Sequence, residues 1–341
     1  MSASGEVHRS DLNEPGITRR RCGRGFRYFD PEGRPLREEE RARVKALVVP
    51  PAWRNVWISP HPGGHIQATG TDSAGRLQYL YHPDWRAQRD REKYDKVLVF
   101  SEWLPKIREI AHFHLRERRF SRDRVLSAAL RLIDLGFFRS GGESYAENNE
   151  TYGLATLLRE HVSCSRNRVT FHYPAKGGKR REVELLEEDV CRLVAGLKRR
   201  KGGGEELLAY RVGEGWHDVT TDDINAYLQE LTGEEYTAKD FRTWHATVLA
   251  AVGLAVSTKA AQSRTGENRA EARVAQEVAE YLGNTPAVAR ASYIDPRLFT
   301  LYEEGITIAP RLGKIGAEAE YGELSTQGDI EDAVRKMLRE N

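Results

Sequence analysis

Two kinds of hydrophobic spacing divide this chain, and the change from one to the other limits the possible folds. Between about residues 46 and 82, short runs rich in Val, Ile, Trp and Tyr are separated by Pro, Gly, Asp and Ser, which is typical of strands and turns. Beyond about residue 90, apolar residues recur three and four positions apart over 91–118, 121–138 and 150–162, as in amphipathic helices. Strands followed by helices indicate the α+β class.

The length of 341 residues allows two domains, so we predict two lobes on either side of this change. A loose N-terminal tail is expected over residues 1–16, a small β-sheet domain over 17–90, and a mostly α-helical domain over 91–341. Inside the helical part, alternating residues at 168–173 and 181–185 flank the turn sequence PAKGGK, which predicts a small β-hairpin.

Capping signals mark several helix ends in the second lobe. Thr220 and Thr237 each stand three residues before an aspartate, an arrangement typical of the first turn of a helix. Thr285, followed by proline, predicts a helix that runs to about Tyr293. Spaced apolar residues from Ile330 to Leu338 predict a last amphipathic helix.

The charges of the chain are balanced in number but clustered in position. Lys and Arg number 53 against 51 Asp and Glu, and the net charge of +2 excludes a polycationic coat protein of the histone type. Residues 18–27 nevertheless hold five arginines and no acidic residue, and residues 198–201 read KRRK. Two interpretations stay open for each cluster, a solvated surface or contacts to the phosphates of a nucleic acid.

The cysteines and the apolar runs indicate in which cellular compartment the protein is expected. Cys22, Cys164 and Cys191 lie far apart and form no Cys-x-x-Cys pair, which argues against a disulfide scaffold and against a zinc site. No apolar run approaches the roughly 18 residues of a membrane span, and the first residues contain no apolar signal core. These features fit the reducing cytoplasm, and we expect no membrane partner.

Motifs for nucleotide and metal chemistry are missing from the sequence. It contains no Gly-x-x-x-x-Gly-Lys-Ser/Thr loop, no Gly-x-Gly-x-x-Gly and no His-Glu-x-x-His. It also lacks a close group of carboxylates able to hold Mg²⁺. We therefore expect no cofactor, no nucleotide and no metal, and ATP-driven or metal-hydrolase chemistry is disfavoured.

Segments in a fixed order carry the strongest functional signal. From the N-terminus they are PPAWRNVWIS with GTDSAGRLQYLYHPDW, then LIDLGFFRSGGESYAENNETYGLATL, FHYPAKGGK, KDFRTWHATVLA and LGNTPAVARASYIDP. Over about residues 20–300 they resemble the type IB DNA topoisomerases, specifically the compact poxvirus-like enzymes found also in bacteria. The resemblance implies a β-sheet N-terminal domain and a mostly helical catalytic domain.

The resemblance also implies a set of catalytic residues. Tyr293 stands at the position of the nucleophile, and Lys176 on the hairpin turn matches the general acid. Arg139 and Arg242 match the two arginines that stabilise the transition state. Asn284 stands where viral and eukaryotic members have histidine, and its amide can still donate a hydrogen bond to a phosphate oxygen.

The activity implied by the resemblance is an exchange of phosphodiester bonds in DNA. In this family a tyrosine oxygen attacks a backbone phosphorus, forms a 3′-phosphotyrosine and expels a 5′-hydroxyl, without ATP or an obligatory metal. Relaxation of positive and negative supercoils follows when the cut strand swivels and is religated. The implied partner is double-stranded DNA, held by a monomer that closes as a clamp hinged near residues 83–95. In a bacterium such an enzyme would associate with the nucleoid.

Five residues are candidates for contact with DNA. Tyr145 aligns with a DNA-contacting tyrosine of the viral relatives, and the other four lie in the predicted strand GRLQYLY: Arg76, Gln78, Tyr79 and Tyr81. Alternation places the two tyrosines on one face of that strand and Gln78 on the other. Packing of the tyrosines into the core is the competing interpretation.

Two other functions remain open. A tyrosine recombinase uses a similar Arg, Lys, Arg and Tyr set, but that family typically carries His-x-x-Arg where this chain has Lys239-Asp-Phe-Arg242. A DNA-binding relative with weakened catalysis is the second alternative, and the asparagine at position 284 is its only support.

Overall fold

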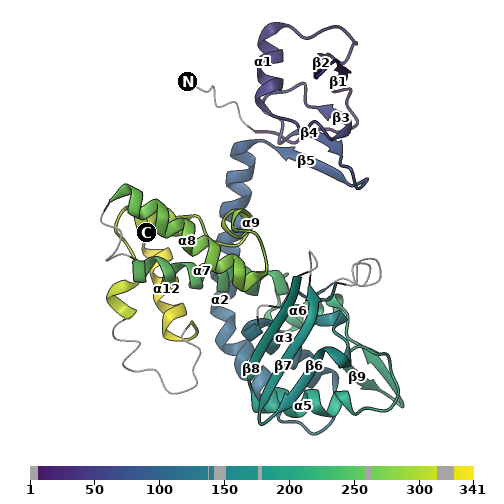
Figure 1. The fold of residues 1–341 in the computed structure, drawn as a ribbon, viewed down its shortest axis with the longest axis vertical. Helices are drawn as coiled ribbons and strands as arrows, with labels where there is room; N and C mark the ends of the chain where they lie inside the picture. Colours follow the sequence, from purple (N-terminus) through teal and green to yellow (C-terminus); the bar gives the residue numbers. More distant parts are fainter. Residues whose placement is uncertain (1–6, 137, 142–150, 176–178, 258–262, 313–325) are drawn as a thin grey trace. The chain divides into compact units, whose positions relative to one another are not determined.

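The structure is a computed structural model that describes residues 7–136, 138–141, 151–175, 179–257, 263–312 and 326–341. It divides into two compact units, Met1–Asp95 and Lys96–Asn341. The first is built on a five-stranded sheet, and the second is mainly helical with two smaller sheets, which confirms the α+β prediction (Figure 1). No helix within the described ranges is long and apolar enough to cross a membrane.

The first unit is an antiparallel sheet with one helix, α1 (Glu38–Ala46). Most of its buried core is formed by Val44 of the helix and by Ile17, Ile58 and Ala68 of the strands, as expected for a sheet with one face packed on a core. In the spatial order of the sheet, the strands are β2 (Gly25–Phe29), β1 (Ile17–Cys22), β3 (Arg54–Ile58), β4 (Ile66–Thr71) and β5 (Leu77–Tyr81).

Residues 7–16 lie in the stretch for which we predicted a loose tail. The His8 N–H donates to the Gly63 carbonyl at 3.0 Å, and the Ser10 N–H donates to the ring nitrogen Nδ1 of His65 at 2.7 Å. These bonds attach the stretch to the loop before β4. After β5 the chain enters helix α2 (Pro83–Leu115), which includes the expected link over 83–95 and within which the two units divide.

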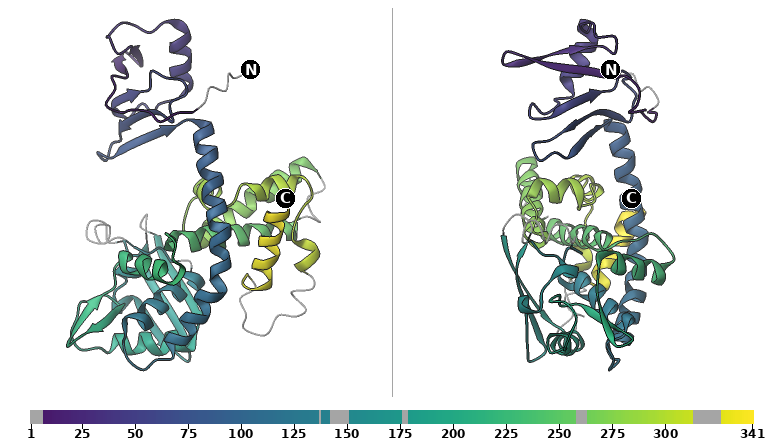
Figure 2. Two further views of the ribbon diagram at one scale, coloured as in Figure 1. Left: turned by 180° about the vertical axis from the view of Figure 1, so that it is seen from behind. Right: turned by 90° about the vertical axis from the view of Figure 1, so that its right-hand side faces the viewer.

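The second unit is organised around one buried helix. Its helices beyond α2 are α3 (Arg122–Gly136), α5 (Glu188–Lys198), α6 (Thr221–Thr232), α7 (Ala238–Ser257), α8 (Arg264–Leu282), α9 (Pro286–Ser292), α10 (Arg297–Glu303) and α12 (Asp329–Glu340). Helix α7 packs against α3, α8, α10 and α12 (Figures 1 and 2). Phe241 and Trp244 of α7 are almost fully buried, so this helix forms the centre of the core.

Two small sheets complete the second unit. The three-stranded sheet has the order β6 (Val162–Ser165), β7 (Arg168–Ala175) and β8 (Lys179–Leu186), all antiparallel. Strands β7 and β8 are the predicted hairpin, and α3 packs against β8 (Figure 1). Strands β9 (Ala209–Val212) and β10 (Gly215–Asp218) form a separate pair.

The predicted helix over 150–162 is wrong. Its described part contains two 3-10 turns, Leu154–Thr156 and Arg159–His161, followed by β6. The backbone N–H groups here donate to other segments, as in the bond from Leu154 to the Arg139 carbonyl at 2.7 Å and the bond from Tyr152 to the Pro174 carbonyl at 2.9 Å. Tertiary hydrogen bonds therefore override the helical spacing of the apolar residues.

The predicted helix ends in the second unit are confirmed where side chains cap them. The Thr220 hydroxyl accepts from the Asp223 N–H at 3.1 Å, and the Thr237 N–H donates to the Asp240 carboxylate at 2.7 Å. The Thr285 hydroxyl accepts from the N–H three residues on at 3.3 Å and starts α9. The last amphipathic helix is α12, whose apolar face is buried.

Candidate active site

Helix α8 ends in a sharp turn that sets the position of Asn284. Gly283 has a left-handed backbone with φ of 63°, which glycine adopts without steric cost. The Asn284 N–H then donates back to the Ala279 carbonyl at 2.9 Å. Because Thr285 begins α9 immediately afterwards, Asn284 lies at the junction of two helices.

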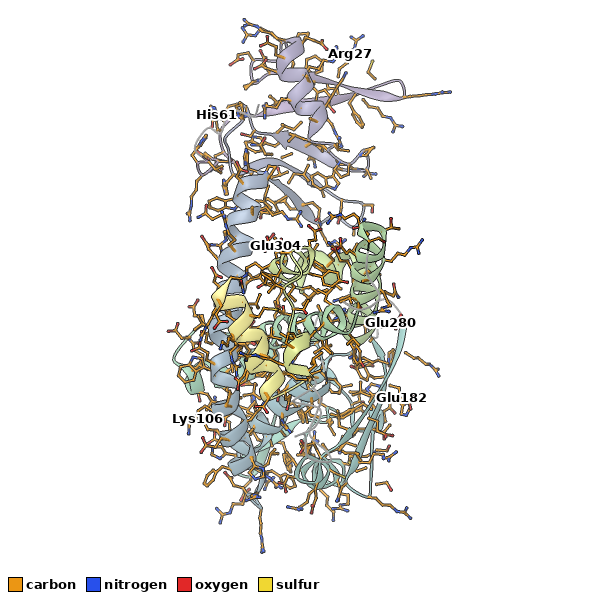
Figure 3. The ribbon with its side chains drawn as sticks, turned by 90° about the vertical axis from the view of Figure 1, so that its left-hand side faces the viewer. Arg27, His61, Lys106, Glu182, Glu280 and Glu304 are labelled. Carbon is orange, nitrogen blue, oxygen red and sulfur yellow. The ribbon has the colours of Figure 1, made fainter. Side chains whose placement is uncertain are left out.

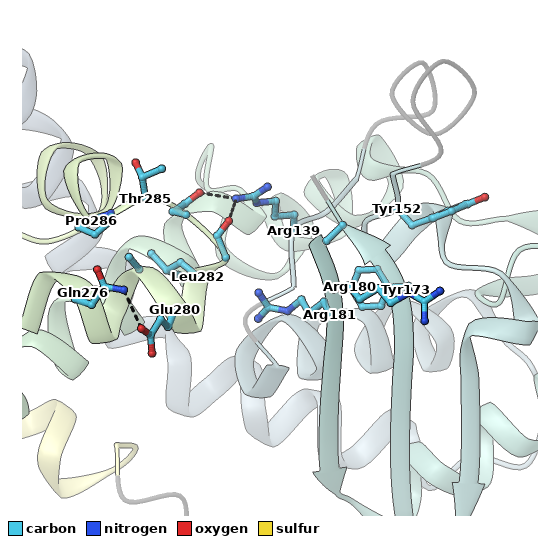
Figure 4. Close-up of a pocket in the computed structure, with 14 residues that line it drawn as sticks. Arg139, Tyr152, Tyr173, Arg180, Arg181, Gln276, Glu280, Leu282, Thr285 and Pro286 are labelled. Atoms are coloured by element: carbon cyan, nitrogen blue, oxygen red, sulfur yellow. Dashed lines mark hydrogen bonds between the residues drawn. The ribbon is translucent and has the colours of Figure 1, made fainter. Parts of the chain in front are cut away.

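Arg139 contacts this junction from a segment three residues beyond α3. Its Nη2 atom donates to the Gly283 carbonyl at 2.9 Å and to Asn284 Oδ1 at 2.5 Å (Figure 4). The guanidinium thereby orients the amide, since only the amide oxygen can accept these protons. The Asn284 nitrogen Nδ2 is buried and has no hydrogen-bond partner among the described residues, so it is available as a donor.

Arg242 reaches the same helix end from α7. Its side chain is buried, with the residue 3 % exposed, and its Nη2 atom donates to the Leu282 carbonyl at 2.8 Å. Burial lowers the pKa of the Arg242 guanidinium to about 10; the neighbouring Tyr293 opposes this shift and the charge of Arg139 adds to it. Arg242 therefore still carries its charge at neutral pH.

Tyr293 lies next to Arg242 at the C-terminal end of α9. The guanidinium carbon of Arg242 is 5.5 Å from the centroid of the tyrosine ring, and the phenol is half-buried. The Thr247 hydroxyl of α7 donates to the Tyr293 carbonyl at 3.4 Å and accepts from the Asp295 N–H at 3.2 Å. The two helices thus hold the phenol beside a cation that can stabilise negative charge on its oxygen.

Arg181 and Tyr173 also belong to this site, and the sequence interpretation missed both. They lie opposite each other on β8 and β7, and Arg181 donates from Nη2 to the Tyr281 carbonyl at 2.8 Å. Burial raises the pKa of the Tyr173 phenol, and the charges of Arg181, Arg242 and Arg139 oppose that shift. A signal was present, because Arg181 alternates with Val183 and Leu185 on the apolar face of the predicted strand.

A cavity of about 340 Å³ opens between the hairpin and the ends of α8 and α9 (Figure 4). Arg139, Arg181 and Asn284 line it, whereas Arg242 and Tyr293 are not among its lining residues. The charged residues that line the cavity are Arg139, Arg180 and Arg181 against one carboxylate, Glu280, so positive charge predominates. Such a surface suits an anion.

Two predicted site residues lie outside the described residues. Lys176 lies within residues 176–178, and Tyr145 lies within residues 142–150. The strands on either side of the turn are described, and Ala175 pairs with Lys179 as the last pair of the hairpin.

The predicted DNA-contacting residues of the first unit share strand β5 and the turn before it. Tyr79 and Tyr81 are 39 % and 47 % exposed, and their rings stack with centroids 6.0 Å apart, so the competing interpretation of core packing is wrong. Arg76 and Gln78 both bind the Asp72 carboxylate at 3.0 Å. The tyrosines thus form an open aromatic surface, and Arg76 and Gln78 are held in place by one carboxylate.

The two basic clusters differ in exposure. Arg20 and Arg27 on the β1–β2 hairpin are exposed, as are charged residues elsewhere on the chain such as Lys106 and Glu182 (Figure 3). Arg200 of the KRRK cluster is buried instead, and its guanidinium donates to the carbonyls of Glu206 at 2.5 Å and Leu207 at 2.9 Å. The phosphate-binding interpretation is therefore wrong for Arg200, which stabilises a loop.

Two family models match the sequence. Residues 82–305 match the model described as eukaryotic DNA topoisomerase I, catalytic core. Residues 25–72 match the model described as bacterial DNA topoisomerase IB, N-terminal domain. The first of these matches lies mostly in the second structural unit, and the second match lies in the first unit.

Individual proteins similar to this chain are also named DNA topoisomerases. The chain is 31 % identical to the DNA topoisomerase 1B of Acanthamoeba polyphaga mimivirus, over 84 % of this chain and 88 % of the relative. It is 20 % identical to the DNA topoisomerase 1B of vaccinia virus, over 69 % of this chain and 72 % of the relative. It is 30 % identical to the DNA topoisomerase 1 of Daucus carota, but over 46 % of this chain and only 19 % of that longer protein.

Proposed function

Because this chain belongs to the type IB DNA topoisomerase family, we propose that it relaxes supercoiled DNA of either sign by cutting and resealing one strand. The observation that carries the proposal is the convergence of Arg139, Arg242, Asn284 and Tyr293 at the end of α8. These residues come from four separate segments. Arg139 and Asn284 line the cavity, and Arg242 binds the neighbouring Leu282 carbonyl, so we propose that the phosphate binds here.

The proposed reaction is a transesterification in two directions. The Tyr293 oxygen attacks a DNA phosphorus and loses its proton, the phosphorus–O5′ bond breaks, and the 5′-oxygen leaves as a hydroxyl after it gains a proton. The product is a 3′-phosphotyrosine. After the cut strand swivels, the 5′-hydroxyl attacks the same phosphorus and releases the phenol. One ester replaces another, so the cycle requires no ATP.

Arg139, Arg242 and Asn284 are proposed to stabilise the crowded phosphorus. Two permanent cations and one amide donor match the charge that develops on the nonbridging oxygens. Arg242 is buried in this conformation and bonded to the Leu282 carbonyl. We propose that phosphate oxygens replace the helix carbonyls as acceptors when DNA binds, with little change in the position of the guanidinium groups.

Lys176 is proposed as the general acid for the 5′-oxygen. A turn lysine on a hairpin can present an ammonium proton to a leaving alkoxide, which is too basic to leave unaided. In support, the described strands on either side of this lysine reach the cavity, since Ala175 and Arg180 both line it.

Binding of double-stranded DNA is proposed to use both units. The stacked Tyr79 and Tyr81, with Arg76, Gln78 and the exposed arginines of the β1–β2 hairpin, would contact the duplex from the first unit. Tyr145 would contact it from the second. We propose that a monomer closes around the duplex as a clamp, in the cytoplasm and at the nucleoid if the source is bacterial.

A plasmid relaxation assay in EDTA, without ATP, tests the proposal. The intact chain should relax both positively and negatively supercoiled plasmid, and denaturant added during the reaction should trap a protein–DNA adduct at a 3′-phosphate. The Tyr293→Phe variant should bind DNA as the original chain does, yet form no adduct and relax no plasmid.

Two results would contradict this function. Relaxation by Tyr293→Phe would exclude the proposed nucleophile. DNA binding by the unaltered chain with no adduct under any quench would favour the catalytically weakened relative, and efficient exchange between paired sites would favour a recombinase.

A further inference from the structure

Arg181 joins the ends of the two helices that lead to Arg139 and Asn284. Its Nη2 atom donates to the carbonyl of Gly136, the last residue of α3, at 3.2 Å and to the carbonyl of Tyr281, in the last turn of α8, at 2.8 Å. Arg139 follows the end of α3 by three residues, and Asn284 follows the end of α8 by two. One guanidinium thus links the two backbone segments from which these side chains extend.

The bond to Tyr281 belongs to a regular series along the end of α8. Three consecutive carbonyls each accept from a different arginine: Tyr281 from Arg181 at 2.8 Å, Leu282 from Arg242 at 2.8 Å and Gly283 from Arg139 at 2.9 Å. The last carbonyls of a helix have no donors within the helix, and they form the negative end of its dipole. The three guanidinium groups are therefore bound to successive carbonyls at the end of the helix.

The surroundings of Arg181 are too confined for an ordinary surface arginine. Burial lowers the pKa of its guanidinium, with Tyr173 opposing the shift and Arg139 adding to it. The Nε atom is buried and has no hydrogen-bond partner among the described residues. A β-carbon added at Gly283 would come within 3.0 Å of Nη1, so the close approach depends on glycine at that position. The unfavourable burial of this charge requires a compensating role.

We propose that Arg181 is a positioning residue for strand cleavage, which sets the Arg139 guanidinium and the Asn284 amide at the spacing that the phosphate requires. This rests on the proposed topoisomerase function. Arg181 acts through Arg139 and Asn284, because its Nη2 atom bridges carbonyls of both helix ends and contact with a phosphate would break that bridge. Loss of Arg181 should therefore change the rate of the chemical step and not the affinity for DNA.

Single-turnover cleavage of a short duplex tests the role of Arg181. The Arg181→Met variant should form the covalent adduct about 10- to 100-fold more slowly, because a displacement of about 1 Å in a positioning group costs up to this factor. Arg181→Lys keeps the charge and one donor toward the carbonyls, so it should recover part of the rate. DNA affinity, measured in the Tyr293→Phe background to prevent cleavage, should stay within about twofold. Arg168→Met is the matched control, because Arg168 is exposed on the same hairpin and paired with Glu184 at 2.8 Å.

A double-mutant cycle separates positioning from a general loss of structure. If Arg181 acts through Arg139, then Arg181→Met should slow cleavage by less than about threefold when Arg139 is already alanine. Full additivity of the two losses, or an Arg181→Met variant that cleaves at the original rate, would overturn the inference. So would an equal loss in Arg168→Met. Absence of any adduct with the unaltered chain would instead overturn the proposed function.

Discussion

At the scale of single residues, the orientation of the Asn284 amide decides whether it can replace histidine. Arg139 binds the amide oxygen at 2.5 Å, and the nitrogen is left as a buried donor. A neutral imidazole can offer the same pair, an acceptor nitrogen toward Arg139 and an N–H toward a phosphate. The chemistry of the site thus depends on one donor, and two side-chain types can provide it.

The cleavage rate of a variant at position 284 should depend on whether the new side chain keeps this donor. We expect Asn284→His to keep or raise the cleavage rate and Asn284→Leu to lower it about 100-fold, as for the loss of one preorganised donor. Asn284→Asp should be at least as slow as the leucine variant, because it places a negative charge where the phosphate binds. Single-turnover adduct formation measures all three. A large loss in the histidine variant would contradict this account.

The proposed general acid can be tested by changing the leaving group. Lys176→Ala should slow cleavage by about 10²- to 10⁴-fold on ordinary DNA. A substrate with sulfur in place of the 5′-bridging oxygen expels a thiolate, and a thiol with a pKa of about 8.5 needs no proton from the enzyme. The variant should cleave this substrate nearly as fast as the original chain does. If the sulfur substrate remains equally slow, Lys176 has another role.

At the scale of helices, a buried charged cluster ties α7 to its neighbours. Arg108 of α2 donates from Nε and Nη2 to Asp134 of α3, each at 2.9 Å, and also to Glu331 of α12 at 2.6 Å. His245 contacts Asp134 at 3.0 Å, and Trp244 donates to Glu331 at 2.9 Å. Trp244 and His245 follow Arg242 on α7 by two and three residues. The cluster therefore fixes the rotation of the helix that carries Arg242, the second arginine of the proposed active site.

Loss of the central carboxylate should destabilise the second unit. Asp134→Asn leaves Arg108 buried with less compensation, and the free energy of unfolding should fall by about 3–5 kcal/mol. Urea unfolding measures the loss. The control is Asp332→Asn, whose exposed ion pair with Arg335 should contribute less than about 1 kcal/mol. Equal stability of the Asp134 variant and the original chain would show that the cluster is energetically neutral.

The same carboxylate predicts a dependence of stability on pH. Burial alone would raise the pKa of Asp134, but the charge of Arg108 and the hydrogen bonds from His245 and Arg108 hold it far below its ordinary range. The stabilising effect is therefore complete above the ordinary aspartate pKa of about 3.9 and is lost as the pH falls below it. The difference in unfolding free energy between the original chain and Asp134→Asn should stay constant from about pH 7 to 5 and shrink from about pH 4 to 3. A constant difference down to pH 3 would contradict this origin.

At the scale of the whole molecule, DNA affinity should depend on the exposed arginines of the first unit and not on Tyr293, the proposed nucleophile. Replacing Arg20, Arg21 and Arg24 together by glutamine should weaken binding and reduce the slope of log affinity against log salt by up to about 3, since each phosphate contact contributes about 0.9. Fluorescence anisotropy with a duplex at several salt concentrations measures the slope. Tyr293→Phe should leave the slope unchanged. An unchanged slope in the triple variant would exclude the β1–β2 hairpin from the DNA surface.

Local chemistry explains why much of this architecture was predictable from sequence. Strand alternation, the caps at Thr220 and Thr285 and the pairing of the hairpin strands depend on residues a few positions apart, and the structure confirms them. The helix predicted over 150–162 failed because its backbone donors bond to distant carbonyls, including that of Arg139. Periodicity does not reveal which partner a backbone N–H will find.

Sequence alone determined the change from strands to helices along the chain, the two-lobe division and, through the family resemblance, which residues to propose as catalytic. Only the tertiary structure decided that Arg200 is buried, that Tyr79 and Tyr81 are exposed, and that Arg181 lies between two helix ends. The physical reason is that an arginine or a tyrosine can either stay in water or be buried with partners, and the outcome depends on carbonyls and carboxylates supplied by remote parts of the chain. The series of three arginines along the end of α8 is such a case, because no local pattern links residues 139, 181 and 242.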